Sequence, residues 1–200
     1  MSTVDRVREH LLEYQAQRGF DAPVSASLTF LGVEPVEVMR WAGVVEGVPT
    51  IVFASVGCSR HAMTDPSDFA PSDDGPRAEV LLELTPRTPD QAELRGAHRT
   101  VALLAASPAV EGLVLGPDAL VDLSAPLWEG APFTAVLLAE SDVPDLSIPA
   151  GSQVCFLRAV PITANEAAWV RLKGADALRE AWAEASIDPA DPARAAANQV

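Results

Sequence analysis

The chain has 200 residues, of which 48% are hydrophobic and 21% are charged. This ordinary globular mixture excludes wholesale disorder. The 14 Lys and Arg residues stand against 28 Asp and Glu residues, so the formal net charge is −14. Such a field repels the phosphate backbone of nucleic acids and attracts basic surfaces. We therefore expect no nucleic-acid partner.

Cysteine usage and hydropathy indicate the compartment. Cys58 and Cys155 are far apart and form no CxxC pair, which excludes a disulfide framework and favours a reducing environment. The first ten residues lack the apolar centre of a signal peptide. No stretch reaches the roughly 18 apolar residues of a membrane span. The sequence predicts a cytoplasmic protein without membrane contact.

The first element in chain order is a helix over residues 3–18. Apolar side chains recur there at three- and four-residue spacing, and Gly19 follows as a stop. Apolar runs separated by turn residues then predict three strands, and a turn-rich acidic segment predicts a surface loop. Alternation predicts a further strand after that loop. These predicted strands cover residues 25–31, 36–41, 50–56 and 77–84, with the loop over 64–76.

In the second half of the chain, Thr88 with Gln91 is typical of a capping box and predicts a helix start. Ser107-Pro108 is expected to end that helix or to begin another. Apolar runs between Pro- and Gly-containing turns predict three more strands, over residues 120–123, 133–138 and 153–161.

A second capping box, Thr163 with Glu166, predicts a helix that stops at Gly174. A further helical period covers residues 175–186. Helices and strands alternate irregularly, which predicts an α+β fold with one mixed sheet. We expect a single domain over 1–200, with its core at about 3–187 and a loose tail at 195–200.

The one pair that resembles a nucleophile and its base is Cys58 with His61. Two side chains three residues apart in a loop seldom point at each other, so Cys58 is better interpreted as a small apolar filler. The histidines lack zinc spacing, and the acidic loop lacks a calcium-binding pattern. We expect no metal and no cofactor.

Four tryptophans could serve as anchors in an interface. Two of them lie on predicted helix faces beside apolar residues, so core packing is the better interpretation there. Trp128 lies in the turn-rich segment Ala-Pro-Leu-Trp-Glu-Gly-Ala-Pro. We expect its ring to be exposed and available to a partner.

Four pieces of sequence, in this order and spacing, resemble the Suppressor of fused domain family. They are a strand ending in Gly57-Cys58-Ser59, a strand that begins with Arg77 and Glu79, a strand running into Pro161-Ile162-Thr163 with Glu166, and a closing Asp191-Pro192-Ala193-Arg194. The resemblance covers the chain from about Ser25 to Arg194. It implies a mixed, largely antiparallel sheet packed with helices.

The resemblance also implies what the pieces do. In this family, animal members hold a peptide between two domains by adding it to a sheet edge, and we expect that cleft to be absent in the same form from a single domain. Stand-alone bacterial members resemble immunity proteins encoded beside secreted toxins. We expect a non-catalytic protein-binding domain whose partner is a basic toxin domain. Asp191, Arg194 and Trp128 are the expected partner-binding residues, and Gly57, where a residue without Cβ is expected, belongs to a structural turn.

Three alternatives remain open at this point. The Cys58 and His61 region could belong to an enzyme. The domain could be a scaffold without a toxin partner. Asp191 and Arg194 could form an exposed ion pair, or Asp191 could meet a partner while Arg194 holds the closing segment against the domain.

Overall fold

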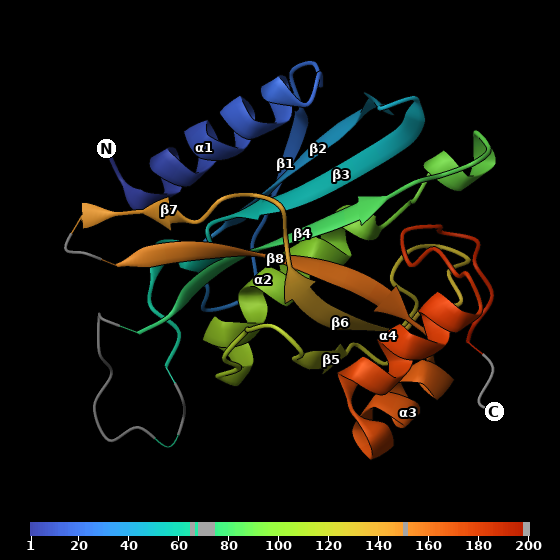
Figure 1. Ribbon diagram of the computed structural model, residues 1–200. Helices are drawn as coiled ribbons and strands as arrows, with labels where there is room; N and C mark the ends of the chain where they lie inside the picture. The colour runs from blue at the N-terminus through green and yellow to red at the C-terminus, as the bar shows by residue number, and fades with distance from the viewer. Residues whose placement is uncertain (65–66, 68–74, 150–151, 198–200) are drawn as a thin grey trace.

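The computed structural model describes residues 1–64, 67, 75–149 and 152–197. Within these residues, helices and strands follow in the order α1 Thr3–Gln17, β1 Val24–Leu28, β2 Val36–Val45, β3 Val48–Val56, η1 Cys58–Arg60, β4 Arg77–Leu84, η2 Asp90–Ala92, α2 Ala97–Glu111, β5 Leu120–Asp122, β6 Ala135–Glu140, β7 Leu146–Ser147, β8 Gln153–Ile162, α3 Ala164–Lys173 and α4 Ala175–Glu184. The predicted α+β class is confirmed (Figure 1).

The strands form one mixed sheet in the order β1-β2-β3-β4-β8-β6-β5, and β7 also pairs with β8. The pairing of β4 with β8 is parallel, and the other pairings are antiparallel. The first three strands, which the sequence predicts, pair as an antiparallel meander. β8 lies next to β4 although 68 residues separate Leu84, the end of β4, from Gln153, the start of β8.

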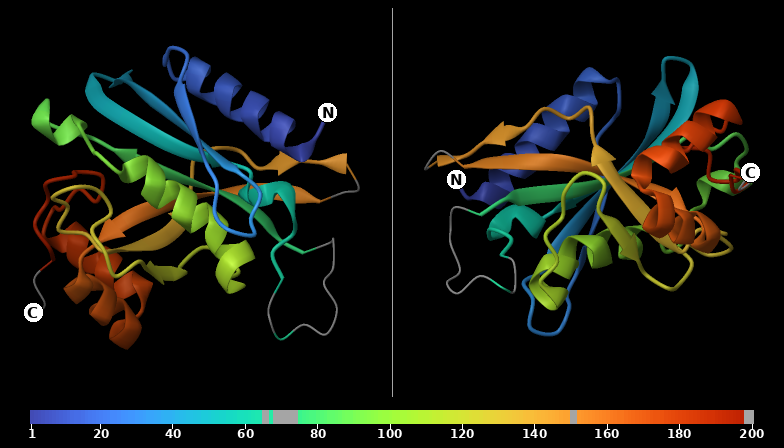
Figure 2. Two further views of the ribbon diagram at one scale, coloured as in Figure 1. Left: turned by 180° about the vertical axis from the view of Figure 1, so that it is seen from behind. Right: turned by 60° about the horizontal axis from the view of Figure 1, so that its bottom comes forward.

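Helices cover both faces of the sheet, as the alternation along β8 shows. Val154 and Phe156 share a core cluster with α1, and Val160 and Ile162 share one with α3 and α4. Leu157 points to the opposite face of the strand and packs in the core cluster that contains α2 residues. Figure 2 shows α1 and the α3–α4 pair over one face and α2 over the other. Both faces of the central strands are therefore buried, which explains their continuous apolar runs.

The start of α2 differs from the prediction. Thr88 does not open a helix, because Gln91 accepts a hydrogen bond from the Arg87 amide instead of the Thr88 amide. Leu94 and Gly96 both have positive φ angles, of 38° and 90°. These left-handed residues interrupt the backbone after the short η2 turn, so the long helix begins only at Ala97.

The end of α2 also differs. The helix continues through Pro108 to Glu111. Pro108 has no N–H to donate to the Leu104 carbonyl, four residues earlier. The Ser107 hydroxyl donates to that carbonyl instead, at 2.7 Å. The carbonyl thus keeps a partner, which lets the helix tolerate the proline.

The sequence predicts a loose tail at 195–200 and a surface loop at 64–76, and the structure describes only parts of both. Residues 195–197, expected to be loose, are held: Arg194 donates to the Ala195 carbonyl, and the Ala197 amide donates to Glu166. Residues 198–200, and most of the acidic loop at 65–66 and 68–74, lie outside the described residues. The Met63 amide donates to the Pro76 carbonyl at 2.8 Å and so brings the two sides of that loop together.

Among the described residues, no helix is long and apolar enough to cross a membrane. The same part of the chain gathers no group of three His, Cys, Asp or Glu side chains that could hold a metal ion.

Candidate functional site

A buried carboxylate joins the ends of β3 and β4. Glu79 on β4 has no solvent exposure. It accepts hydrogen bonds from the Gly57 and Ser59 amides at 2.9 and 3.0 Å, and from the Ser55 and Ser59 hydroxyls, both at 2.5 Å. Burial raises the pKa of the Glu79 carboxyl, and these donors act in the opposite direction. Glu79 therefore fixes the turn that carries Gly57 and Ser59.

Arg77 holds the same turn from its other side. Its guanidinium donates to the carbonyls of Ser59 and Arg60 at 3.0 and 2.8 Å. Gly57 has a φ of 131°, and a Cβ at this position would meet the Pro35 carbonyl oxygen at 3.3 Å. The structure thus brings Gly57, Ser59, Arg77 and Glu79 together at one turn.

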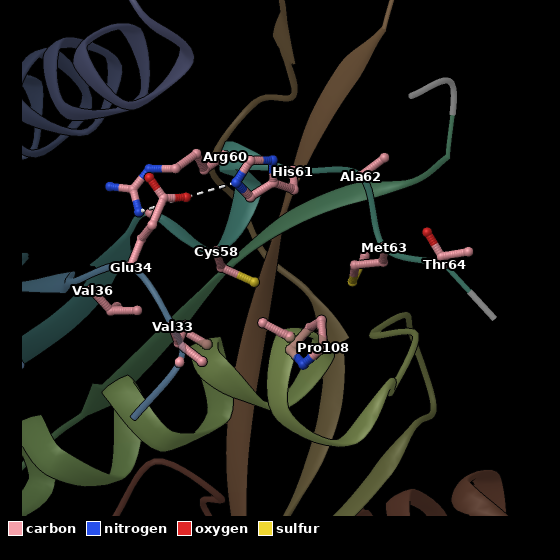
Figure 3. Close-up of a pocket in the computed structure, with 14 residues that line it drawn as sticks. Val33, Glu34, Val36, Cys58, Arg60, His61, Ala62, Met63, Thr64 and Pro108 are labelled. Atoms are coloured by element: carbon pink, nitrogen blue, oxygen red, sulfur yellow. Dashed lines mark hydrogen bonds and ion pairs between the residues drawn. The ribbon is translucent and has the colours of Figure 1, made fainter. Parts of the chain in front are cut away.

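Cys58 and His61 line a cavity of about 270 Å³ between this turn and α2 (Figure 3). The Cys58 thiol points into the cavity and away from the His61 ring. His61 Nε2 lies 2.6 Å from Glu34 Oε2. Burial raises the pKa of the Cys58 thiol well above its usual value, which opposes formation of a thiolate. The pair is therefore not arranged as a nucleophile with its base.

A second buried carboxylate, Glu166, organises the C-terminal part. It forms the predicted capping box with Thr163: the Thr163 amide donates to it at 2.9 Å, and the Glu166 amide donates to the Thr163 hydroxyl at 3.3 Å. Arg194 donates to both Glu166 oxygens at 2.7 and 2.9 Å, and also to the Pro161 carbonyl at 2.7 Å. Trp182 donates its indole N–H to Glu166. Burial alone would raise the pKa of Glu166, but these donors, Arg194 first, hold it below its usual value.

Asp191 does not pair with Arg194. Its carboxylate lies 3.0 Å from Arg87 Nε, and it also accepts from the Ala193 amide. The Arg194 side chain points inward and is only 3% exposed. An exposed Asp191–Arg194 ion pair is therefore wrong, because the Arg194 guanidinium binds Glu166 instead. The contacts of Arg194 agree with its expected task of holding the closing segment against the domain.

The prediction of an exposed Trp128 is wrong, because this residue is only 7% exposed. The turn after it folds back through hydrogen bonds from the Leu127 amide to the Phe133 carbonyl and from the Ala131 amide to the Trp128 carbonyl. This places the Trp128 ring 5.6 Å from the Phe133 ring. Phe133 in turn lies 4.8 Å below the Arg194 guanidinium. Trp128 and Arg194 are thus linked through one aromatic ring.

Trp128 and Pro192 line a surface depression of about 500 Å³, which we call the acidic hollow. The residues that line it are Asp90, Gln91, Glu93, Leu94, Arg95, Trp128, Glu129, Gly130 and Pro192. Leu94, Trp128 and Pro192 are buried, whereas Asp90, Glu93 and Glu129 are exposed. The Glu129 amide donates to the Arg95 carbonyl at 2.8 Å and joins the two walls. The hollow combines apolar side chains with three carboxylates.

Sequence reasoning did not find the acidic hollow as a site. The sequence predicts a helix start at Thr88 and a turn around Glu129, so neither segment stands out as a site. Asp191 and Arg194 do not line the hollow, although Pro192 between them does. The available signal was the group of acids at 90, 93 and 129 in two turn-rich segments. That signal becomes a surface feature only when tertiary packing joins the segments.

Solved structures show the same fold. A Suppressor of fused homologue from Neisseria gonorrhoeae is 19% identical, with a TM-score of 0.68, and the match covers 98% of this chain and 97% of that one. A chain in the structure of a Sufu–Fu complex is 14% identical, with a TM-score of 0.64, and the match covers 90% of this chain and 84% of that one. Drosophila Suppressor of fused is 13% identical, with a TM-score of 0.55, and the match covers 84% of this chain and 43% of that one.

No curated protein sequence matches the chain. The family model of the Suppressor of fused protein matches residues 32–195. That span includes both buried carboxylates, Glu79 and Glu166, and their partners Ser59, Thr163 and Arg194, all of which lie in the sequence pieces that resemble the family. The chain belongs to the Suppressor of fused family.

Proposed function

We propose that this chain is a non-catalytic protein-binding domain that captures a basic partner, with the acidic hollow as part of the contact surface. The observation that carries the proposal is the composition of the hollow. Asp90, Glu93 and Glu129 line the hollow together with apolar side chains, and Arg95 pairs with Glu93 at 3.0 Å. A lysine or arginine side chain has the matching form, with an aliphatic stem and a cationic head.

The charge of the whole chain supports the same proposal. A net charge of −14 accelerates encounter with a basic partner and makes binding strongly dependent on salt. The known structure of a Sufu–Fu complex is that of a relative bound to a protein. In its most specific form, the proposal is an immunity protein that neutralises a basic toxin domain.

The proposal places the domain in the cytoplasm, where both cysteines stay reduced; Cys58 and Cys155 are unpaired in the structure. A catalytic alternative around Cys58 lacks geometric support, since the His61 ring pairs with Glu34 and the thiol points away from it. The contacts of Asp191 make it a bracing residue beside the hollow, through Arg87.

Pull-down with the immobilised domain tests the proposal. The test variant is Asp90→Asn/Glu93→Gln/Glu129→Gln, which removes the three carboxylates of the hollow. The matched control is Glu9→Gln/Glu13→Gln/Glu184→Gln, which removes three exposed carboxylates from α1 and α4. Both variants carry the same net charge, so only the position of the lost charges differs.

We expect the wild type and the control to capture the same basic protein, and the hollow variant to lose it. The product of a neighbouring toxin gene is the first candidate to examine. Equal capture by both variants would overturn the role of the hollow. An equal loss in both would show that net charge alone attracts the partner. A measured turnover that is lost in a folded Cys58→Ala/His61→Ala variant would favour the catalytic alternative.

A further inference from the structure

The strand β1 is the end of the sheet, and within the part of the chain that the structure describes it pairs with β2 on one side only (Figure 1). The outer side of an end strand presents backbone N–H and C=O groups, which another strand can bind. Proteins usually protect such an edge with lysine, proline or a bulge. β1 has the sequence Val-Ser-Ala-Ser-Leu, so none of its five side chains is charged and none is proline.

Four of the five β1 side chains are also open to solvent, and Leu28 is partly buried against the core. Val24 is 71% exposed, and Ser25, Ala26 and Ser27 are exposed as well. The uncharged stretch extends from Ala22 to Val33 in a chain with 28 acidic residues. The edge is thus neutral in an otherwise acidic protein.

The opposite edge of the sheet differs. β5 has only three residues, Leu120–Asp122. Asp122 at its end forms an ion pair with Arg171 of α3 at 2.7 Å, and Asp118 just before it pairs with Arg179 of α4. Charges and helices therefore protect β5 and leave β1 as the longer neutral edge.

The sequence of β1 is complementary to itself. If two copies pair in antiparallel fashion about Ala26, Val24 lies opposite Leu28 of the second copy, and Ser25 lies opposite Ser27. Apolar side chains then meet apolar ones and hydroxyls meet hydroxyls, which are favourable cross-strand pairs. Such a pairing has two-fold symmetry, the commonest symmetry of protein dimers.

The acidic charge near this edge is partly neutralised. Glu37, opposite Ser27 on β2, forms an ion pair with Arg8 of α1 at 2.7 Å. Glu34, which precedes β2, binds the His61 ring at 2.6 Å and lies 3.6 Å from Arg60. Each of these carboxylates therefore has a basic partner within its own chain, which lowers the repulsion between two copies.

We propose that β1 binds β1 of a second copy of this chain, in antiparallel orientation with Ala26 on the two-fold axis, and so continues the sheet across a dimer. The contact involves one five-residue strand from each chain, so association is weak and depends on concentration. The acidic hollow is formed by other segments, and its role does not depend on this dimer.

Sedimentation equilibrium of the full chain from about 1 μM to about 500 μM tests the proposal. We expect a monomer–dimer equilibrium for the wild type. Two variants then distinguish the effect of strand orientation in the dimer from the effect of added charge. Ser25→Lys/Ser27→Lys places like charges opposite each other in the proposed pairing. Ser25→Lys/Ser27→Glu places opposite charges there, whereas parallel pairing in the same register would place like charges together.

We expect the first variant to weaken the dimer by about tenfold or more and the second to retain it. The first variant lowers the net negative charge, so its loss of association cannot come from greater overall repulsion. Leu172→Lys, at an 80% exposed position on α3, is the control and should dimerise like the wild type. Thermal melting checks that every variant is folded.

A wild type that stays monomeric throughout the range would overturn the proposal. Equal association of both charged variants, or loss of association in both, would also overturn it, because antiparallel pairing requires them to differ. A monomeric wild type whose β1 amides become protected only when a different protein binds would assign the edge to that protein instead.

Discussion

Arg194 and Glu166 form a buried two-point ion pair, with Nη1 of Arg194 2.7 Å from Oε1 of Glu166 and Nη2 2.9 Å from Oε2. Their side chains are 3% and 0% exposed. The Arg194 guanidinium also lies between the rings of Phe133 and Trp182, at 4.8 and 5.1 Å. The pair attaches the end of the chain to the start of α3.

Arg194→Met should destabilise the domain by about 3–5 kcal/mol, because it leaves the Glu166 carboxylate buried without its cation. Urea unfolding measures this change. The double variant Glu166→Gln/Arg194→Met should recover part of the loss, since no buried charge then remains. Asp191→Ala, which affects the exposed Arg87, serves as comparison and should cost no more than about 1 kcal/mol. Similar losses for Arg194→Met and Asp191→Ala would contradict a buried clasp.

The stability contributed by Glu166 should depend on pH. Its folded pKa is lowered from the ordinary value of 4.5, so the folded state favours the ionised form. This contribution is present above pH 4.5 and is lost as the pH falls through the lower folded pKa. Urea midpoints measured between about pH 6 and pH 3 should fall more steeply for the wild type than for Glu166→Gln. Parallel curves would show that Glu166 has the same pKa in the folded and unfolded states.

Gly57→Val should destabilise the domain by about 1–3 kcal/mol, because its φ of 131° is unfavourable for a β-branched residue. The added Cβ would also press on the Pro35 carbonyl. Gly116→Ala is the control, since a Cβ there meets open space and no positive φ opposes it. Thermal unfolding compares the two variants. An unchanged melting temperature for Gly57→Val would contradict the strained turn.

Thr163→Ala should cost about 1 kcal/mol through loss of the α3 cap. The cap of α1 is Ser2, which forms a capping box with Asp5. Ser2→Ala should lower the free energy of unfolding by less than Thr163→Ala does, because the start of α1 is exposed and can fray. Equal shifts of the unfolding midpoints would show that both caps are equally coupled to the fold.

Local sequence signals located most of the elements, because each signal depends on neighbouring residues. The strand at 77–84 matches β4 at both ends, and the Thr163 and Glu166 capping box marks the start of α3. A cap needs a side chain and an amide three residues apart, so the sequence contains both of its partners. α2 was placed less well, because left-handed Leu94 and Gly96 delayed its start and the Ser107 hydroxyl let it continue past Pro108.

The resemblance to the family was also evident in the sequence, through the order and spacing of four short pieces, and membership was confirmed over residues 32–195. What these pieces do was decided only by tertiary structure. Glu79 binds a turn about 20 residues earlier, and Arg194 binds Glu166, which is 28 residues earlier, instead of the nearby Asp191. Trp128 is buried because its turn folds onto Phe133, and the acidic hollow forms where the segments around residues 90 and 129 meet. The periodicity of helices and strands depends on residues that are close in sequence. The partner of a buried side chain instead depends on which charged groups and apolar surfaces lie near it once the sheet and helices have packed, because a buried charge needs a partner.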